Sequence, residues 1–185
     1  MNVIRSFSLG VFSILVLFFG VGLFLPSHYE VNEQVLIQSK PSKIFFYIDN
    51  LQKWEKWAFK LEDPESRVDP QFLGPEEGEG AVHSWFGNDG SKAQLKILSS
   101  NPYDEIQLQM ITNDGAFISD IVFTLEGGDQ GTLVTWNEKG DFGFNPMVRL
   151  VAYMSDYNKK IATQYQVALE ELKLVVESSK TTSIQ

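Results

Sequence analysis

Cysteine is absent from the 185 residues, and histidine occurs only twice. The absence of cysteine excludes disulfides, thiolate metal sites, cysteine nucleophiles and a thiol-linked lipid anchor. The two histidines are about 55 positions apart and no HExxH motif occurs, so we expect neither a metal nor another cofactor. The GxSxG, P-loop and GxGxxG motifs are missing too, which leaves no recognisable catalytic or nucleotide-binding motif.

Basic residues are also scarce. The chain has 15 Lys and Arg against 24 Asp and Glu, for a net charge of −9, and Arg5 is the only charged residue before His28. The acidic excess therefore belongs to the part of the chain after residue 27. An acidic surface argues against nucleic acid as a partner, since a phosphate backbone needs clusters of Lys and Arg. It also argues against flat adhesion to anionic lipid headgroups.

The N-terminus carries a long apolar run. The 19 residues of Phe7–Leu25 contain no charge, and Pro26 with the polar residues after it ends the run sharply. As a helix this run would span roughly 28 Å, close to the hydrocarbon thickness of a bilayer. We therefore predict a transmembrane signal anchor over residues 1–27, with contact to the membrane through residues 7–25.

A cleaved secretory signal is the alternative to an anchor. Gly20 and Gly22 could provide the small residues of a cleavage site, but the apolar run continues through Leu25 beyond them.

The charges on either side of the apolar run indicate on which side of the membrane the domain lies. Arg5 precedes the run and Glu30 and Glu33 follow it, so we expect a cytoplasmic N-terminus and a periplasmic or extracytoplasmic domain.

The segment 28–177 has the length of one domain, and we interpret 178–185 as a flexible tail. Tyr29–Gln38 alternates apolar and polar residues like a half-buried strand, and Lys43–Ile48 and Leu51–Phe59 indicate two short helices. Short alternating segments separated by Asn-Asp-Gly and Gly-Gly-Asp turns then predict antiparallel hairpins. These strands are expected at Val68–Leu73, Ala81–Phe86, Lys92–Ser99, Glu105–Ile111, Ala116–Leu125 and Thr132–Glu138.

A single long helix is predicted from Met147 to Glu177. Apolar residues recur there at a spacing of three or four and form one stripe, which we expect to cover the sheet. The members of that stripe are Met147, Val151, Met154, Ile161, Tyr165, Ala168, Leu172 and Val175.

The order of these elements is that of the α+β helix-grip fold, in which a curved antiparallel sheet of about six or seven strands wraps a long C-terminal helix. The stretch YEVNEQVLIQSKPSKIFFYIDNLQKWEKWAF resembles the opening of polyketide cyclase/dehydrase-like members of the START-like (SRPBCC) superfamily. GEGAVHSWFG and GDFGFNPMVRLVAYMSDY resemble a glycine-flanked strand and the start of the final helix in the same family. The likeness runs from about Tyr29 to Glu177, and many members carry a similar apolar N-terminal segment.

The resemblance implies an elongated cavity between sheet and helix that accepts a hydrophobic small molecule or a lipid. His83 shares strand parity with Trp85 and would face the cavity with it. Asp141 precedes the final helix, where it would complement the helix N-terminus or line the cavity mouth. For any single aromatic residue, ordinary core packing is the simpler interpretation. The candidate ligand-binding residues are Trp57, His83, Trp85, Phe117, Trp136, Asp141, Phe144 and Tyr153.

Three functions are compatible with this pattern. The first is a membrane-tethered, non-enzymatic module that binds an apolar molecule, which the absence of a catalytic cluster favours. The second is a structural or interaction protein of the cell envelope. The third is a cyclase, dehydratase or hydrolase in which His83 or Asp141 acts as acid or base. The sequence does not indicate an oligomeric state.

Overall fold

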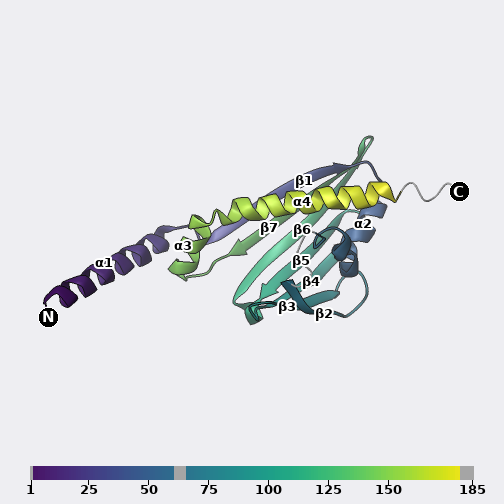
Figure 1. Cartoon of the computed structure of the whole chain (residues 1–185). Coiled ribbons are helices and arrows are strands. Elements are labelled where there is room, and N and C mark those ends of the chain that lie inside the picture. Colours follow the sequence, from purple (N-terminus) through teal and green to yellow (C-terminus); the bar gives the residue numbers. More distant parts are fainter. Residues whose placement is uncertain (1, 61–65, 180–185) are drawn as a thin grey trace.

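The computed structural model describes residues 2–60 and 66–179, apart from the side chains of 2–4, 14 and 15. Within these residues, seven strands form one antiparallel sheet in the order β1-β7-β6-β5-β4-β3-β2 (Figure 1). The strands are β1 His28–Ile37, β2 Arg67–Leu73, β3 Val82–Gly87, β4 Lys92–Asn101, β5 Glu105–Thr112, β6 Phe117–Gly128 and β7 Gly131–Asp141. The helices are α1 Asn2–Phe24, α2 Pro41–Asp49, α3 Pro146–Met154 and α4 Tyr157–Ser178, with short 3-10 turns η1 Leu51–Lys56 and η3 Asn113–Gly115.

Alternating burial gives the sheet one inward face. On β7 the buried residues are Thr132, Val134, Trp136 and Glu138, at a spacing of two. The first strand pairs with β7, which places Val35 opposite Val134 and makes β1 one edge of the sheet. The strands β2 to β7 follow one another as hairpins, as the turn sequences predict.

Helix α4 crosses the inward face of the sheet and lies along β1 (Figure 1). It buries Ala168, Leu169, Leu172 and Val176, while α2, η1 and the residue after η1 bring Ile48, Trp54 and Trp57 against the same core. Burying apolar side chains of this size stabilises the fold by about 1.5–3 kcal/mol each, before chain entropy is counted. The predicted α+β helix-grip fold is thus confirmed, with a long C-terminal helix gripped by an antiparallel sheet.

The C-terminal helix begins later than predicted. The chain turns at Ser155 and Asp156, and Asp156 adopts left-handed backbone angles of φ 49° and ψ 47°. An α-helix cannot continue through such a residue, so α3 is a separate element that points away from the sheet. Met147, Val151 and Met154 are consequently exposed, and the prediction that they cover the sheet is wrong.

Helix α1 extends away from the sheet at the end of the domain opposite to the C-terminus (Figure 1). Its segment Arg5–Phe24 is long and apolar enough to cross a membrane, and its described side chains are almost all exposed. Length and composition of this kind fit a membrane span or a signal sequence. The predicted tail falls mainly on residues 180–185, which lie outside the described part of the chain.

Candidate functional site

A cavity of about 380 Å³ lies between α4 and the sheet. We call it the central cavity. Its walls come from η1 and the segment after it, from the inward face of the sheet, and from one side of α4. The lining includes Trp54, Trp57, Ala58, Phe59, Trp85, Leu95, Met110, Ile121, Trp136, Ile161, Thr163, Gln164, Tyr165, Val167 and Ala168. Because Thr163 and Gln164 are exposed residues of α4, polar groups mark the solvent-facing edge of an otherwise apolar space.

Aromatic rings pack closely in the wall of the central cavity. The ring centroids of Trp54 and Trp57 are 4.8 Å apart, and Trp136 lies 4.7 Å from Phe123. Tyr165 of α4 stacks on Trp136 at 3.9 Å with an interplanar angle of 13°. This stacking holds α4 at a fixed distance from β7 at this point, because neither ring can move without losing the contact.

One polar atom in this wall has no partner. The indole N–H of Trp54 donates to the Ile48 carbonyl at 2.8 Å, and that of Trp57 donates to the Tyr47 carbonyl at 3.1 Å. The Nε1 atom of Trp136 is buried and has no hydrogen-bond partner among the described residues. An unpaired buried donor of this kind is costly to the folded chain.

A buried carboxylate lies next to the same wall. Glu138 follows Trp136 on the inward face of β7, accepts a hydrogen bond from the Tyr29 hydroxyl at 2.6 Å, and accepts another from the Tyr165 hydroxyl. Burial and the neighbouring carboxylate raise the pKa of both tyrosines, so the hydroxyls stay protonated and act as donors. The three residues connect β1, β7 and α4 through one charged acceptor.

Sequence reasoning missed Glu138, although a signal was present. Glu138 continues the parity of Val134 and Trp136, so its charge falls on the buried face of a strand. A charged residue in that position needs partners, and the tyrosines supply them.

His83 is fully buried beside the central cavity rather than in its described lining. Its ring stacks on Phe72 at 4.4 Å, and the rings of Phe59 and Trp85 lie 5.7 and 4.7 Å away. Both ring nitrogens lack hydrogen-bond partners among the described residues. Burial, with a further contribution from the nearby Arg67 cation, lowers the His83 pKa to about 4, so the imidazole is neutral at pH 7.

The predicted site residues fall into two groups. Trp57, Trp85 and Trp136 line the central cavity, and His83 packs behind Trp85. The others gather near the α3 end of the molecule and do not line the central cavity: Phe117, Asp141, Phe144 and Tyr153.

Of those four residues, Phe117 and Asp141 make local contacts, and the other two are exposed. Phe117 stacks with Tyr29 and Phe142 at 6.0 and 6.2 Å. Asp141 accepts the Gly143 N–H at 2.8 Å and pairs with His28 at 3.3 Å, both on the surface. Phe144 and Tyr153 are exposed.

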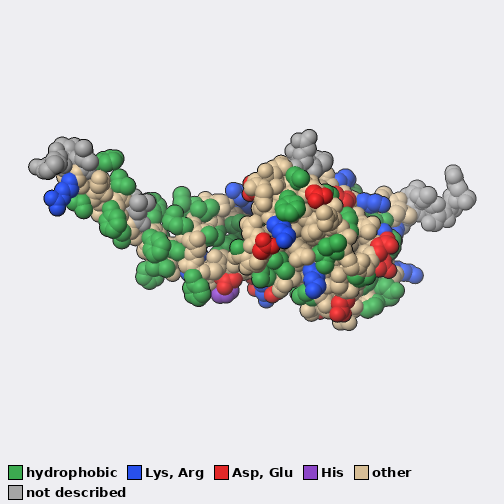
Figure 2. Space-filling view, turned by 90° about the horizontal axis from the view of Figure 1, so that it is seen from below, with side chains coloured by type: hydrophobic (Ala, Val, Ile, Leu, Met, Phe, Trp, Pro, Cys, Tyr) green, Lys and Arg blue, Asp and Glu red, His purple; other side chains and the backbone are tan. Residues whose placement is uncertain are grey.

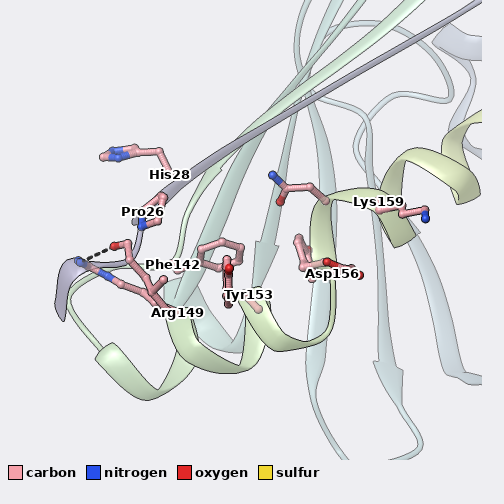
Figure 3. Close-up of a pocket in the computed structure, with 11 residues that line it drawn as sticks. Pro26, His28, Phe142, Arg149, Tyr153, Asp156 and Lys159 are labelled. Atoms are coloured by element: carbon pink, nitrogen blue, oxygen red, sulfur yellow. Dashed lines mark hydrogen bonds between the residues drawn. The ribbon is translucent and has the colours of Figure 1, made fainter. Parts of the chain in front are cut away.

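A second hollow of about 250 Å³, which we call the α3 pocket, lies where α3 and α4 meet the segment after α1 (Figure 3). Pro26, Phe142 and Tyr153 form its apolar part, and Asp156 and Lys159 line its edge. The guanidinium of Arg149 donates to the Gly143 carbonyl and, at 3.4 Å, to the Leu25 carbonyl. This pocket is built from the junction between the N-terminal helix and the domain.

Among the described residues, no group of three or more His, Asp or Glu side chains is arranged to hold a metal ion. The Trp136 indole is a donor without a partner among the described residues in the wall of the central cavity, and Thr163 and Gln164 add polar groups at its solvent-facing edge. The hydroxyls of Tyr29 and Tyr165 donate to Glu138. This arrangement can orient a polar end of an apolar molecule.

Comparison with known proteins identifies the fold of the chain but not its family. No protein-family model matches the chain, and no curated protein matches it in sequence. Among solved structures, protein SA2116 from Staphylococcus aureus aligns at a TM-score of 0.61 with 11% identity, over 84% of this chain and 97% of that one. Protein CV1439 from Chromobacterium violaceum aligns at 0.57 with 15% identity, over 80% of this chain and 96% of that one.

Two further neighbours have informative names. Ara h 8.0201 aligns at a TM-score of 0.57 with 14% identity, over 82% of this chain and 99% of the other. DynU16, a protein of the dynemicin biosynthetic locus, aligns at 0.57 with 13% identity, over 81% of this chain and 48% of the other. At these identities the likeness establishes the fold alone, an antiparallel sheet with a long C-terminal helix.

Proposed function

We propose that the chain is a membrane-tethered binding domain that holds a hydrophobic small molecule or a lipid in the central cavity. The observation that carries the proposal is the central cavity itself, which has a volume of about 380 Å³. Its lining is largely aromatic and aliphatic and includes Trp136, whose Nε1 atom is an unpaired donor. Cavities of about 300–1,000 Å³ with apolar walls and few polar groups are typical of small-molecule sites. The ligand class that fits is an apolar body carrying one hydrogen-bond acceptor.

Tethering is the second part of the proposal. Helix α1 serves as an uncleaved anchor with Arg5 on the cytoplasmic side, which leaves residues 28–177 as a domain on the extracytoplasmic side. The exposed apolar surface of Arg5–Phe24 supports this assignment, because in water such a surface would be unfavourable.

The enzymatic alternative gains no support from these contacts. An acid or base would have to reach the ligand, but His83 is enclosed by aromatic rings and Asp141 is occupied at the surface by Gly143 and His28. We therefore place ligand binding ahead of a cyclase, dehydratase or hydrolase reaction.

The binding proposal is tested with a dansylated undecanoic acid as probe and the purified full chain in mild detergent. Titration should give saturable binding with a blue-shifted dansyl emission, the signature of an apolar site. Trp136→Phe keeps an aromatic ring but removes the unpaired donor, so we expect binding about two- to tenfold weaker.

Trp57→Phe is the matched control, because it also changes the cavity wall but removes a donor already bonded to Tyr47. The affinity of this variant should stay closer to that of the parent chain. Absence of saturable probe binding to the parent chain would reject the proposed function.

A further inference from the structure

Helix α3 presents an apolar outer surface. The helix is described along its whole length, and its five exposed residues are Met147, Val148, Val151, Tyr153 and Met154. Four of them fall at a spacing of i, i+1, i+4 and i+7, which places them on one side of the helix. A helix on the surface of a water-soluble domain normally exposes its polar residues instead.

Helix α4 of the same molecule shows the ordinary pattern. Its exposed positions are mainly polar or charged, among them Asn158, Lys159, Lys160, Gln164 and Glu170. The apolar surface of α3 is therefore a local property and does not reflect the composition of the chain. The extreme case is Phe144, just before α3, which is 95% exposed.

The one charge of α3 does not interrupt this surface. Arg149 is the only charged residue in Pro146–Met154, and its guanidinium turns inward to the carbonyls of Gly143 and Leu25. Asp156 and Lys159 mark the place where the chain becomes polar again, at the beginning of α4.

Close contacts fix α3 beside the C-terminal end of α1. Gly22 is buried, and a Cβ atom there would lie 2.3 Å from the Pro146 carbonyl oxygen, so the two helices touch through backbone. The Phe142 N–H donates to the Ser27 carbonyl at 2.7 Å, and Arg149 reaches Leu25 as described above. Figure 2 shows apolar side chains along α1 and on to the point where it meets the domain.

We propose that Phe144 and the outer side of α3 are immersed in the interface of a lipid bilayer, as a second membrane contact continuous with α1. This inference rests on the proposed anchor, because the end of α1 at Phe24 then lies at the membrane surface and carries α3 there. The occupant that fits is lipid, since the surface continues an apolar span, lacks outward charge and includes Phe and Tyr side chains typical of the headgroup boundary. The domain is thereby held against the membrane, with the α3 pocket at the lipid surface.

The test uses the natural absence of cysteine. Single cysteines are introduced in the full chain by Phe144→Cys and Val151→Cys, both at exposed positions where folding should tolerate them, and are labelled with a nitroxide. The protein is reconstituted into vesicles of phosphatidylcholine and phosphatidylglycerol. The collision rates of each label with oxygen, which concentrates in lipid, and with a water-soluble nickel chelate are measured.

Two further variants provide the matched controls. Phe18→Cys reports on α1, and Leu174→Cys places the label at an exposed apolar position of α4 far from the junction. We expect the ratio of oxygen to nickel collisions to be several-fold higher at positions 18, 144 and 151 than at 174.

Other results would overturn the inference in distinguishable ways. Lipid exposure at position 18 combined with water exposure at 144 and 151 would leave the anchor intact and reject the role of α3. Shielding of 144 and 151 from both reagents would indicate a protein partner or a second copy of the chain, and would also reject it. Water exposure at position 18 would remove the proposed anchor, and the inference with it.

Discussion

His83 illustrates how burial sets the chemistry of a single side chain. The sequence suggested an acid or base, because an ordinary histidine titrates near neutral pH. The structure surrounds the ring with Phe59, Phe72 and Trp85, and its pKa falls to about 4. A neutral imidazole that is enclosed by aromatic rings behaves as part of the aromatic core.

This environment makes stability depend on pH. Between pH 6.5 and about 4 the unfolded chain binds a proton at His83 that the folded chain does not, so the free energy of unfolding falls as the solution is acidified through this window. The contribution is at most about 3 kcal/mol. His83→Phe removes it, and urea unfolding at about pH 7 and about pH 4.5 should show a smaller acid loss for the variant. An equal fall in the free energy of unfolding for the parent chain and the variant would contradict a lowered pKa of His83.

Glu138 is the other residue whose surroundings decide its role. Glu138→Gln replaces a charged acceptor of two tyrosine hydroxyls by one amide oxygen, and we expect a loss of about 2 kcal/mol in the free energy of unfolding. Denaturant unfolding measures the change. The control is Glu30→Gln, an exposed change on neighbouring β1, which should lower the free energy of unfolding much less than Glu138→Gln does. Similar effects at both positions would rule out a special role for the buried carboxylate.

At the scale of elements, strands were easier to predict than the final helix. Alternating residues and Asn-Asp-Gly or Gly-Gly-Asp turns indicate hairpins directly, and the seven strands follow within a few residues of the predicted bounds. The apolar stripe of the final helix has a step of seven positions from Met154 to Ile161, and the polar residues within that step are the one signal of the turn at Asp156. An apolar stripe does not reveal what it faces, so the sequence alone does not separate the residues that cover the sheet from those of α3.

The left-handed residue between α3 and α4 should be sensitive to substitution. Asp156→Gly removes the steric cost of a positive φ and is expected to be neutral or slightly stabilising. Asp156→Val places a β-branched side chain there and should destabilise the folded chain by about 1–2 kcal/mol. Thermal unfolding of both variants measures the difference. An equal effect of Gly and Val would mean that α3 and α4 are not joined by this turn.

The candidate site could be predicted in part. Trp57, Trp85 and Trp136 follow from aromatic composition and strand parity, and all three line the central cavity. The unpaired state of Trp136 Nε1 and the tyrosine partners of Glu138 depend on distances across helix and sheet, which a single sequence does not contain. The sequence suggests Asp141 as a residue of the cavity mouth because it precedes a helix expected to cover the sheet, and it suggests Phe144 as one of the cavity aromatics. Since that helix begins at Tyr157, they lie at the α3 end instead.

On the scale of the whole molecule, the central cavity and the α3 pocket lie in different parts of the domain. The central cavity opens beside α4, and the α3 pocket lies at the junction with α1. The cluster of Glu138, Tyr29 and Tyr165 connects these regions, because Tyr165 lines the cavity while Tyr29 packs against Phe142 of the α3 pocket at 5.1 Å. An apolar ligand and a membrane surface would thus meet opposite sides of one hydrogen-bonded cluster.

The central claim is that the space under α4 holds an apolar molecule, and native mass spectrometry of the full chain released from detergent tests it most directly. We predict a co-purifying apolar species on the parent chain and on Leu174→Phe, which enlarges an exposed side chain of α4. The species should be lost from Ala168→Phe, which places a ring in the cavity wall. An unliganded parent chain, or retention of the same species by the filled variant, would contradict the account.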